Sequence, residues 1–528
     1  MKKILYNMIG VRCWVLAVGC LLLASCSTPV ENARQEAALP QIYPDYPGVT
    51  IPVNIAPLNF CMSDEKALCI DAVITDGHGN TLHSQGEESV DFDMDDWHAL
   101  LDRNRGDSLS VTVSARYDDG WHTYQPFQIY VSPDSIDYGI CYRLIEPGYE
   151  VWSRMGIYER ELSTFDERAL IENTQFEGCV NCHSFNRGNP ADMSLHIRGK
   201  HGATLLRKDN GSLTAYNTKT DLTLGLCVYP YWHPSGRYIA YSTNKTNQLF
   251  HSASPNRIEV FDTASDLQVY DVEKNELLLS PLLKRDSVYE TYPVFSADGR
   301  SLYFCVAADS LEFRADGSES DTTIPSALDT RAVANATLST KLNSLRYSLC
   351  RIDFDPETGS FGNRIDTIID AALQRKSVSF PRPSYDGRYL CYTLSDYGQF
   401  SIWHHEADLW LLDLTTGESR PMTAANSDDT ESFHNWSTNS RWLVLSSRRD
   451  DGLYTRPYFC HVDAEGNVCK AFMLPQRNPR RFYRDRFFSF NVPDFVISPT
   501  RFDGREASRI INDEYRKDFG VRKEAASE

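Results

Sequence analysis

Four segments of the chain repeat one pattern, and this repeat restricts the fold more than any other feature. They read YPYWHPSGRYIAYST (229–243), YPVFSADGRSLYFCV (292–306), FPRPSYDGRYLCYTL (380–394) and FHNWSTNSRWLVLSS (433–447). Each has a leading aromatic residue, alternating apolar residues at its end and, between them, a polar turn centred on Gly236, Gly299, Gly387 or Ser440. Glycine supplies a positive φ at a turn, and the alternation is typical of a strand. Repeats of this kind predict sheets that pack on one another, because one small sheet cannot bury both faces alone.

These repeats resemble the WD40-like repeats of TolB-type β-propellers, over roughly residues 186–495. The resemblance implies a mainly β fold with a propeller of about six blades, with five or seven left open. HSFNRGNPADMSLHIRG (183–199) could open a further blade, and PRRFYRDRFFSFNVPDFV (479–496) could close the ring. Closure would remove the exposed sheet edges that otherwise promote aggregation.

The segment 48–135 is expected to form a separate β-sandwich-like domain. ALCIDAVITD, SLSVTVSARY and FQIYVS alternate apolar with polar residues and are separated by turn sequences, as antiparallel strands with one wet face do. A short helix is expected at DDWHALLDR (95–103). We assign 27–47 to a linker, 136–185 to a connecting segment and 496–528 to a C-terminal helix and tail.

The first 26 residues read as a lipoprotein signal peptide. A basic start precedes the apolar run CWVLAVGCLLLA (13–24), and Ser25 and Cys26 follow it. A transmembrane helix would need about 20 apolar residues, more than this run contains. LASC resembles a bacterial lipobox, which would make Cys26 the lipidated first residue of a mature protein anchored to the periplasmic face of the inner or outer membrane.

CVNCHSF (179–185) contains the Cys-x-x-Cys-His signature of covalent c-type haem attachment. Cys179 and Cys182 would form thioethers with the haem vinyl groups, and His183 would be the proximal iron ligand. An exported protein suits this reading, because c-type haem is attached outside the cytoplasm. The alternatives are a disulfide or redox pair, a zinc ion or an inert pair. No βαβ pattern favours a redox motif, and no second ligand pair stands at zinc-finger spacing.

The sixth iron ligand is expected in NPADMSLHIRGKHG (189–202), with Met193 preferred over His196 and His201. In an extended strand Met193 and His196 would point to opposite faces, so only one could reach the iron. Met193 also has a plain reading as core packing, and the two histidines as surface residues. Across the chain, the sequence resembles TolB-like propeller lipoproteins of Bacteroidetes-type bacteria that carry a CxxCH segment, a group without an established activity.

Two functions follow from these observations. The first is a monohaem c-type cytochrome lipoprotein that transfers electrons to a redox partner through the propeller. The alternative is a scaffold or binding lipoprotein of the cell envelope, whose propeller binds an envelope partner at its central channel. Hydrolase, P-loop and dinucleotide motifs do not occur, so an enzymatic function is disfavoured but stays open. A net charge of −19 argues against nucleic acid as partner.

Overall fold

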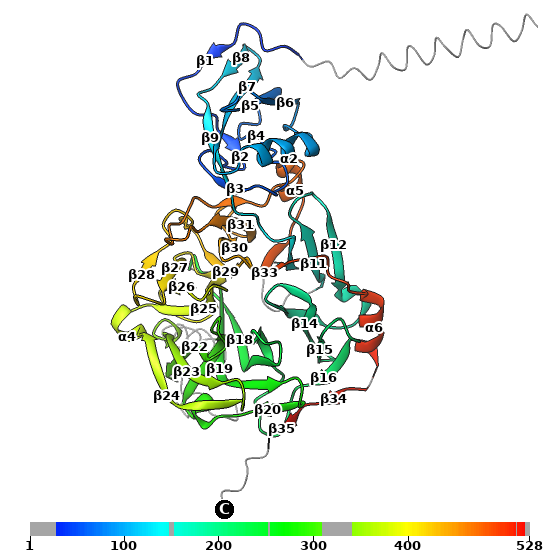
Figure 1. Cartoon of the computed structure of the whole chain (residues 1–528), viewed down its shortest axis with the longest axis vertical. Helices are drawn as coiled ribbons and strands as arrows, with labels where there is room; N and C mark the ends of the chain where they lie inside the picture. Colours follow the sequence, from blue (N-terminus) through cyan, green and yellow to red (C-terminus); the bar gives the residue numbers. More distant parts are fainter. Residues whose placement is uncertain (1–27, 147–152, 252–253, 309–340, 514, 523–528) are drawn as a thin grey trace, which may run out of the picture.

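The computed structural model describes residues 28–146, 153–251, 254–308, 341–513 and 515–522. These residues form a ring of β-sheets around a common centre, with a smaller N-terminal domain at the rim of the ring (Figure 1). The signal sequence and Cys26 lie outside the described residues. Within the described part of the chain, no helix has the length and apolar character needed to cross a bilayer.

Four sheets of the ring stand apart from one another, and each is an up-and-down meander of four strands with, in one case, a fifth added. The first holds β10 (Gly139–Ile145), β11 (Met155–Glu161), β12 (Glu167–Glu172) and β33 (Ser489–Val496). The second holds β13 (Cys179–Asn186), β14 (Asn189–Arg198), β15 (Ala203–Arg207), β16 (Thr214–Asn217) and β34 (Lys517–Asp518). The third holds β25 (Ser377–Pro383), β26 (Tyr389–Ser395), β27 (Asp408–Asp413) and β28 (Ser419–Pro421). The fourth holds β29 (Glu431–Trp436), β30 (Trp442–Ser447), β31 (Arg456–His461) and β32 (Phe472–Met473).

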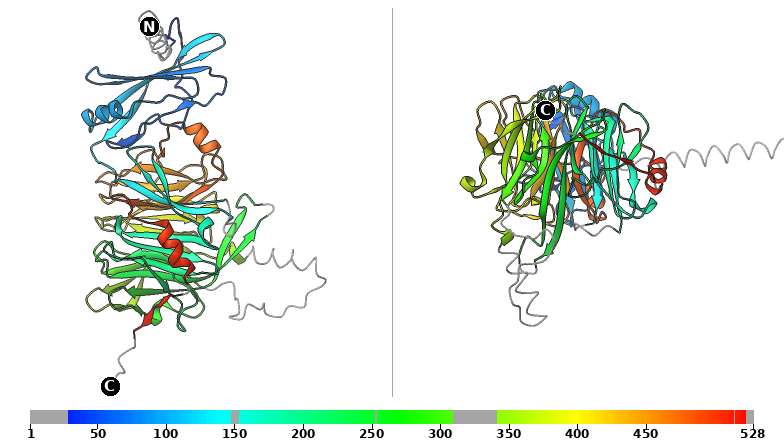
Figure 2. Two further views of the ribbon diagram at one scale, coloured as in Figure 1. Left: turned by 90° about the vertical axis from the view of Figure 1, so that its right-hand side faces the viewer. Right: turned by 90° about the horizontal axis from the view of Figure 1, so that it is seen from below.

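The remaining sheet of the ring has nine strands and contains two meanders. One is β17 (Val228–Trp232), β18 (Tyr238–Phe250), β19 (Ile258–Asp271) and β20 (Glu276–Leu278), with β35 (Gly520–Val521) added at its edge. The other is β21 (Val288–Phe295), β22 (Ser301–Ala308), β23 (Ser348–Asp355) and β24 (Ser360–Ile369). A single parallel bridge, Ser265 to Tyr289, joins them. The ring therefore has four separate blades rather than about six separate sheets, because β18 and β19 are long enough to reach the next meander; their far ends project from the ring (Figure 2).

The ring begins earlier in the sequence than expected. The segment 136–185, predicted as a connection, contributes β10, β11, β12 and most of β13. The closing strand β33 pairs with β10 in antiparallel register, for example Phe495 with Ile140. The first blade is thus built from both ends of the ring sequence, as a closed ring requires. The closing segment 479–496 supplies β33, as expected, but the sequence repeats did not reveal β10, β11 and β12, because the strands of this blade are not contiguous in the chain.

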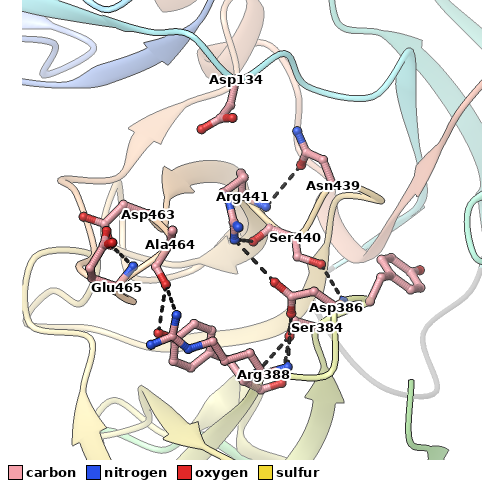
Figure 3. A network of polar contacts seen from close by, with 12 residues as sticks. Asp134, Ser384, Asp386, Arg388, Asn439, Ser440, Arg441, Asp463, Ala464 and Glu465 are labelled. Atoms are coloured by element: carbon pink, nitrogen blue, oxygen red, sulfur yellow. Dashed lines mark hydrogen bonds and ion pairs between the residues drawn. The ribbon is translucent and has the colours of Figure 1, made fainter. Parts of the chain in front are cut away.

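The predicted turns are present. Gly236, Gly299, Gly387 and Ser440 all have positive φ, between 60° and 74°. Turns of neighbouring blades also contact each other: the Ser440 hydroxyl accepts a hydrogen bond from the Asp386 N–H at 3.0 Å, and the Arg388 guanidinium donates to the carbonyl of Ala464 (Figure 3). Hydrogen bonds between turns hold adjacent blades at one spacing on this face of the ring.

The N-terminal domain differs from the predicted sandwich. Seven strands join in one sheet instead of two stacked sheets. They are β1 (Arg34–Gln35), β3 (Thr50–Pro52), β5 (Cys69–Asp76), β6 (Thr81–Gly86), β7 (Ser108–Tyr117), β8 (Gly120–Thr123) and β9 (Phe127–Ser132). The long strand β7 pairs along one edge with both β9 and β8, which keeps them in the same sheet. A ribbon of β2 (Ile42–Tyr43) and β4 (Cys61–Met62) completes the strands.

The predicted helix of this domain is confirmed as α2 (Met94–Arg103). The Asp93 side chain caps it by accepting hydrogen bonds from the N–H groups of Asp95 and Asp96. Its buried face consists of Trp97, Leu100 and Leu101. The Asp93 carboxylate therefore acts in helix capping.

The domain and the ring share one hydrophobic core. Trp97 and Ile51 of the domain belong to the same buried cluster as Trp436, Trp442 and Phe459 of the ring. The short helix α5 (Pro479–Arg484) lies at this junction (Figure 1). A continuous apolar core means that the domain is packed on the ring and is not tethered by a free linker.

The C-terminal segment is attached to the ring instead of forming a loose tail. After α6 (Gly504–Asn512), β34 pairs in parallel with β16 and β35 with β20. Between them Phe519 is buried and stacks on Tyr270 with ring centroids 3.7 Å apart. The segment therefore ties the outer edges of two neighbouring meanders together.

Candidate functional site

CVNCHSF forms most of β13, the innermost strand of its blade. The strand carries a β-bulge, because Asn181 pairs with His196 and Ser184 pairs with Ser194. Between these pairs the chain advances three residues on β13 but only two on β14. Cys182 sits at this bulge with a φ of 44°, in the left-handed region. The motif therefore marks an irregular backbone position that the neighbouring strand imposes.

The same bulge recurs in the innermost strand of every meander of the ring. Each of these strands has one non-glycine residue with a φ between 44° and 52°. Regular pairing with the second strand of the meander resumes two residues after it. These residues are Cys182, Tyr229, Tyr292, Phe380, Phe433 and Val492. Four of them are the first residues of the four sequence repeats. CVNCHSF is thus a further copy of the blade repeat, with Cys182 at the position that usually holds an aromatic residue.

His183 follows Cys182 at the repeat position where four of the other copies have proline and one has His434. The two histidines make the same contact. His183 Nε2 donates to the carbonyl of Cys141 at 3.2 Å, and His434 Nε2 donates to the carbonyl of Cys391 at 3.0 Å. Each acceptor lies on the second strand of the preceding blade. Because His434 has no Cys-x-x-Cys before it, this histidine contact belongs to the blade repeat and needs no haem.

Burial fixes the state of both imidazoles. It lowers the pKa of His183 to about 4 and that of His434 to about 3, so both are neutral near pH 7. The nitrogen that donates to the carbonyl is the protonated one, and Nδ1 has no hydrogen-bond partner within the described part of the chain. His183 therefore uses Nε2, the nitrogen a haem iron would need, to bind the neighbouring blade.

The two cysteines do not fit the predicted haem. Covalent attachment requires both sulfurs and the imidazole to face one porphyrin. Cys179 is 1% exposed and packs with Ile145 and Met155 of the preceding blade. The Cys182 sulfur instead contacts the backbone N–H of Tyr229 in the following meander, and burial raises the pKa of its thiol. Both are free thiols, so the alternative of a disulfide between them is not what the structure contains.

The predicted sixth ligands are also engaged in packing. Met193 is fully buried among Val180, Leu195 and Ile197 in the core between two blades. His196 is buried on the other face of β14, where its Nδ1 lies 3.3 Å from the Thr204 hydroxyl. The expected alternation along the strand is thus confirmed, whereas ligation by either residue is not supported by the arrangement. His201 follows β14 and is half-buried.

The repeated bulge also builds the central channel. The residue two places after each left-handed residue points inward, and five such residues line one cavity along the ring axis: Ser184, Tyr231, Arg382, Asn435 and Asp494. Their strands are β13, β17, β25, β29 and β33. The sixth equivalent residue, Val294, is fully buried. Identical backbone geometry thus presents five chemically different polar side chains to one space.

Two charged groups of this set lie close to each other without pairing. Asp494 accepts hydrogen bonds from the Asn435 amide at 2.5 Å and from the Phe185 N–H at 3.3 Å. Burial raises the pKa of Asp494 to about 7, although the charge of Arg382 opposes this shift. The Arg382 guanidinium lies over the Tyr231 ring, 5.5 Å from its centroid, and donates one hydrogen bond, to the carbonyl of Pro381 at 3.0 Å. Among the described residues no carboxylate forms an ion pair with Arg382.

A second arginine lies at the edge of the same cavity. Arg187 is exposed, and its guanidinium sits 5.2 Å from the centroid of the Tyr385 ring while donating to the Tyr385 carbonyl at 3.3 Å. Both arginines therefore have an aromatic ring on one side and unused N–H donors. This arrangement can bind an anionic group, especially a carboxylate, which matches the planar fork of a guanidinium.

Sequence reasoning missed these channel residues. Arg382 and Asp494 were read as ordinary parts of the repeat and of a closing segment. A usable signal was present: aligned on the aromatic or proline positions, the four repeats share no residue type at this inward position, which holds Tyr231, Val294, Arg382 and Asn435. We also find no group of three or more His, Cys, Asp or Glu side chains able to hold a metal ion in the described ranges.

Comparison with known proteins finds no family and only distant structural neighbours. No protein-family model and no curated protein matches the chain. Among solved structures, a TolB-type protein from Agrobacterium tumefaciens is 13% identical with a TM-score of 0.36, covering 69% of this chain and 99% of that one. A DUF4784 family protein from Bacteroides caccae is 10% identical with a TM-score of 0.29, covering 76% and 97%. An oligogalacturonate lyase in complex with manganese is 14% identical with a TM-score of 0.34, covering 64% and 74%.

Proposed function

We propose that this protein is a binding or scaffold lipoprotein of the cell envelope, and that its propeller binds an acidic segment of an envelope protein at the central channel. The observation that carries the proposal is Arg382, a cation inside the channel without an ion-pair partner among the described residues. Placing an arginine there costs desolvation, and a bound carboxylate would restore its hydrogen bonds. Arg187 at the edge would add a second contact.

The chemistry of the channel narrows the ligand. Tyr231 and Tyr385 hold the two guanidinium planes by cation–π contacts, which leaves the N–H edges for a ligand. Asp494 would be partly protonated near neutral pH, so it would oppose an incoming anion only weakly. A carboxylate-bearing side chain on an extended segment would suit this set better than a bulky apolar group.

The proposal is tested by calorimetric titration with a hexaglutamate peptide, with hexaglutamine as the uncharged control. We expect saturable binding of hexaglutamate alone, weakened at least tenfold by Arg382→Ala. The matched control is Arg364→Ala, because Arg364 lies on the outer strand β24, has a side chain 79% exposed and pairs with Asp366 at the surface. Equal binding by the two variants, or no binding by the wild type, would overturn the proposal.

The electron-transfer function is less well supported, because the residues that would hold haem act as parts of the blade repeat. Haem staining of the denatured, exported protein decides between the two functions, since thioether-bound haem survives denaturation. We expect no staining. A stained band at the mass of the mature protein would restore the cytochrome reading.

Two further parts of the proposal concern architecture and location. We propose that the two meanders of the nine-stranded sheet behave as two blades, since each has its own bulge, which would give the ring six. We also propose that acyl chains on Cys26 anchor the protein, with the ring held on the periplasmic side of the membrane. The exported, lipid-anchored location would place the channel where envelope proteins can reach it.

A further inference from the structure

A separate group of reactive side chains lies where the N-terminal domain meets the ring. His461, at the end of β31, has Nε2 2.9 Å from an Asp134 carboxylate oxygen and 3.2 Å from the Ser132 hydroxyl. Ser132 is the last residue of β9, and Asp134 follows two residues later. Asp134 is 327 residues away from His461 in the sequence. Figure 3 shows Asp134 beside the turn network of the ring. The carboxylate therefore reaches the imidazole only because the domain packs on the ring.

A thiol completes the group. The Cys469 N–H donates to the His461 carbonyl at 2.9 Å, next to the antiparallel bridge between Val462 and Val468. Cys469 and His461 therefore face each other across the turn, and their side chains lie on the same side. Of the cysteines that the structure describes, Cys469 is the one that is not fully buried. The turn at residues 463–467 reverses the chain and returns the thiol to the histidine. The thiol therefore lies next to the imidazole, and the imidazole lies next to the carboxylate.

The group opens on a cavity. Thr50 and His461 line it together with Ser132 and the exposed ring of Tyr130. Its walls come from β3, β7 and β9 of the domain and from the end of β31. A small molecule in this cavity would therefore lie against His461 and Thr50, the two residues next to the Cys469 thiol, which is not itself part of the lining.

The charges around the group support a reactive thiol. The hydrogen bond to His461 lowers the pKa of Cys469, against burial and against the nearby charge of Asp463. Burial alone would lower the pKa of His461, but its hydrogen bonds to Cys469 and Asp134 raise it. The other charged groups nearby are Asp107 in the cavity wall and Lys470, which pairs with Asp45 at 2.7 Å. Cys460 also lies close but is fully buried, and burial raises the pKa of its thiol to about 12.

We propose that Cys469 is a nucleophilic thiol that exchanges with low-molecular-weight disulfides entering this cavity, a site independent of the central channel. His461 takes the thiol proton, and Asp134 stabilises the imidazolium. The Cys469 sulfur then attacks one sulfur of the disulfide: a new S–S bond forms, the original one breaks, and the other half leaves as a thiolate with the electron pair. That thiolate takes the proton from His461. The protein thiol is oxidised to a mixed disulfide and the small disulfide is reduced.

The test uses 5,5′-dithiobis(2-nitrobenzoate) on the folded full-length protein and follows the release of thionitrobenzoate. We expect one equivalent to be released rapidly, at least tenfold faster at pH 7 than by N-acetylcysteine. The release should be lost in Cys469→Ser and kept in Cys61→Ser, because Cys61 is buried. Mass spectrometry should place the adduct on Cys469.

The role of the histidine has its own readout. His461→Gln should slow the release at least tenfold at pH 7, and its rate should then rise with pH as for an ordinary thiol of pKa about 8.5. Asp134→Asn, at a side chain 36% exposed and therefore tolerant of change, should give a smaller loss in the same direction. Release only after unfolding, or identical pH profiles for wild type, His461→Gln and Asp134→Asn, would overturn the proposal.

Discussion

Replacing His183 with proline tests whether CVNCHSF is a blade repeat or a haem site. Four other copies of the repeat have proline at this position, each after a residue with φ close to the 44° of Cys182. The backbone at His183 should therefore accept the fixed φ of proline. A haem site would lose its proximal ligand through the same change.

The expected cost follows from the contacts of His183. The substitution removes the hydrogen bond from Nε2 to the Cys141 carbonyl, worth about 1 kcal/mol. It also removes the edge-on contact with the Phe185 ring, worth about 0.5–1 kcal/mol. The free energy of unfolding should fall by about 1–2 kcal/mol in total. Proline at an incompatible strand position costs roughly 3 kcal/mol or more.

Urea unfolding followed by tryptophan fluorescence measures this difference. The matched control is Val180→Pro, on the same strand but in regular pairing with Ile197, where proline should cost at least about 3 kcal/mol. His434→Pro, at the equivalent position, should behave like His183→Pro. The reasoning is refuted if His183→Pro is as damaging as Val180→Pro, or if it removes a covalent chromophore that the wild type carries.

Three further predictions concern the turns, the channel and the anchor. Gly299→Ala should lower the free energy of unfolding, measured in urea, by about 2–4 kcal/mol, because φ is +72° and a Cβ would lie 2.0 Å from His233 Nε2. The control Gly417→Ala has a similar φ but open space around the Cβ, so it should lower the free energy of unfolding by only about 1–2 kcal/mol. In the wild type, the folded state keeps the Asp494 proton between about pH 4 and about pH 7, where the unfolded state has lost it, so the free energy of unfolding should fall as the pH rises. Asp494→Asn lacks this proton and should therefore become more stable relative to the wild type over the same range. Parallel curves of stability against pH would contradict this. Cys26→Ser should leave an unprocessed precursor without metabolic acyl label, and a wild type that takes up no label would contradict the anchor.

Much of the fold could be predicted from the sequence because its signals are local. Gly236 or Gly387 marks a turn wherever it occurs, since the conformational freedom of glycine belongs to the residue itself. The alternation that follows each turn likewise reports one buried and one less buried face. Four copies of the repeat and the helix α2 were therefore visible, and the segment 183–199 was expected as a possible further blade. Its alignment with the repeat was not recognised, because Cys182 stands where the four copies have an aromatic residue.

The sequence by itself thus determined that the chain is mainly β and built from repeated meanders, with further strands before them. Only the tertiary structure decided what CVNCHSF does: the left-handed Cys182 and the carbonyl that His183 binds depend on pairing with β14 and on packing against the preceding blade. The same holds for the channel and for the contact between His461 and Asp134. Such sites are assembled from residues that are distant in the chain, and the free energy that brings them together comes from burying the shared core, which no short motif encodes.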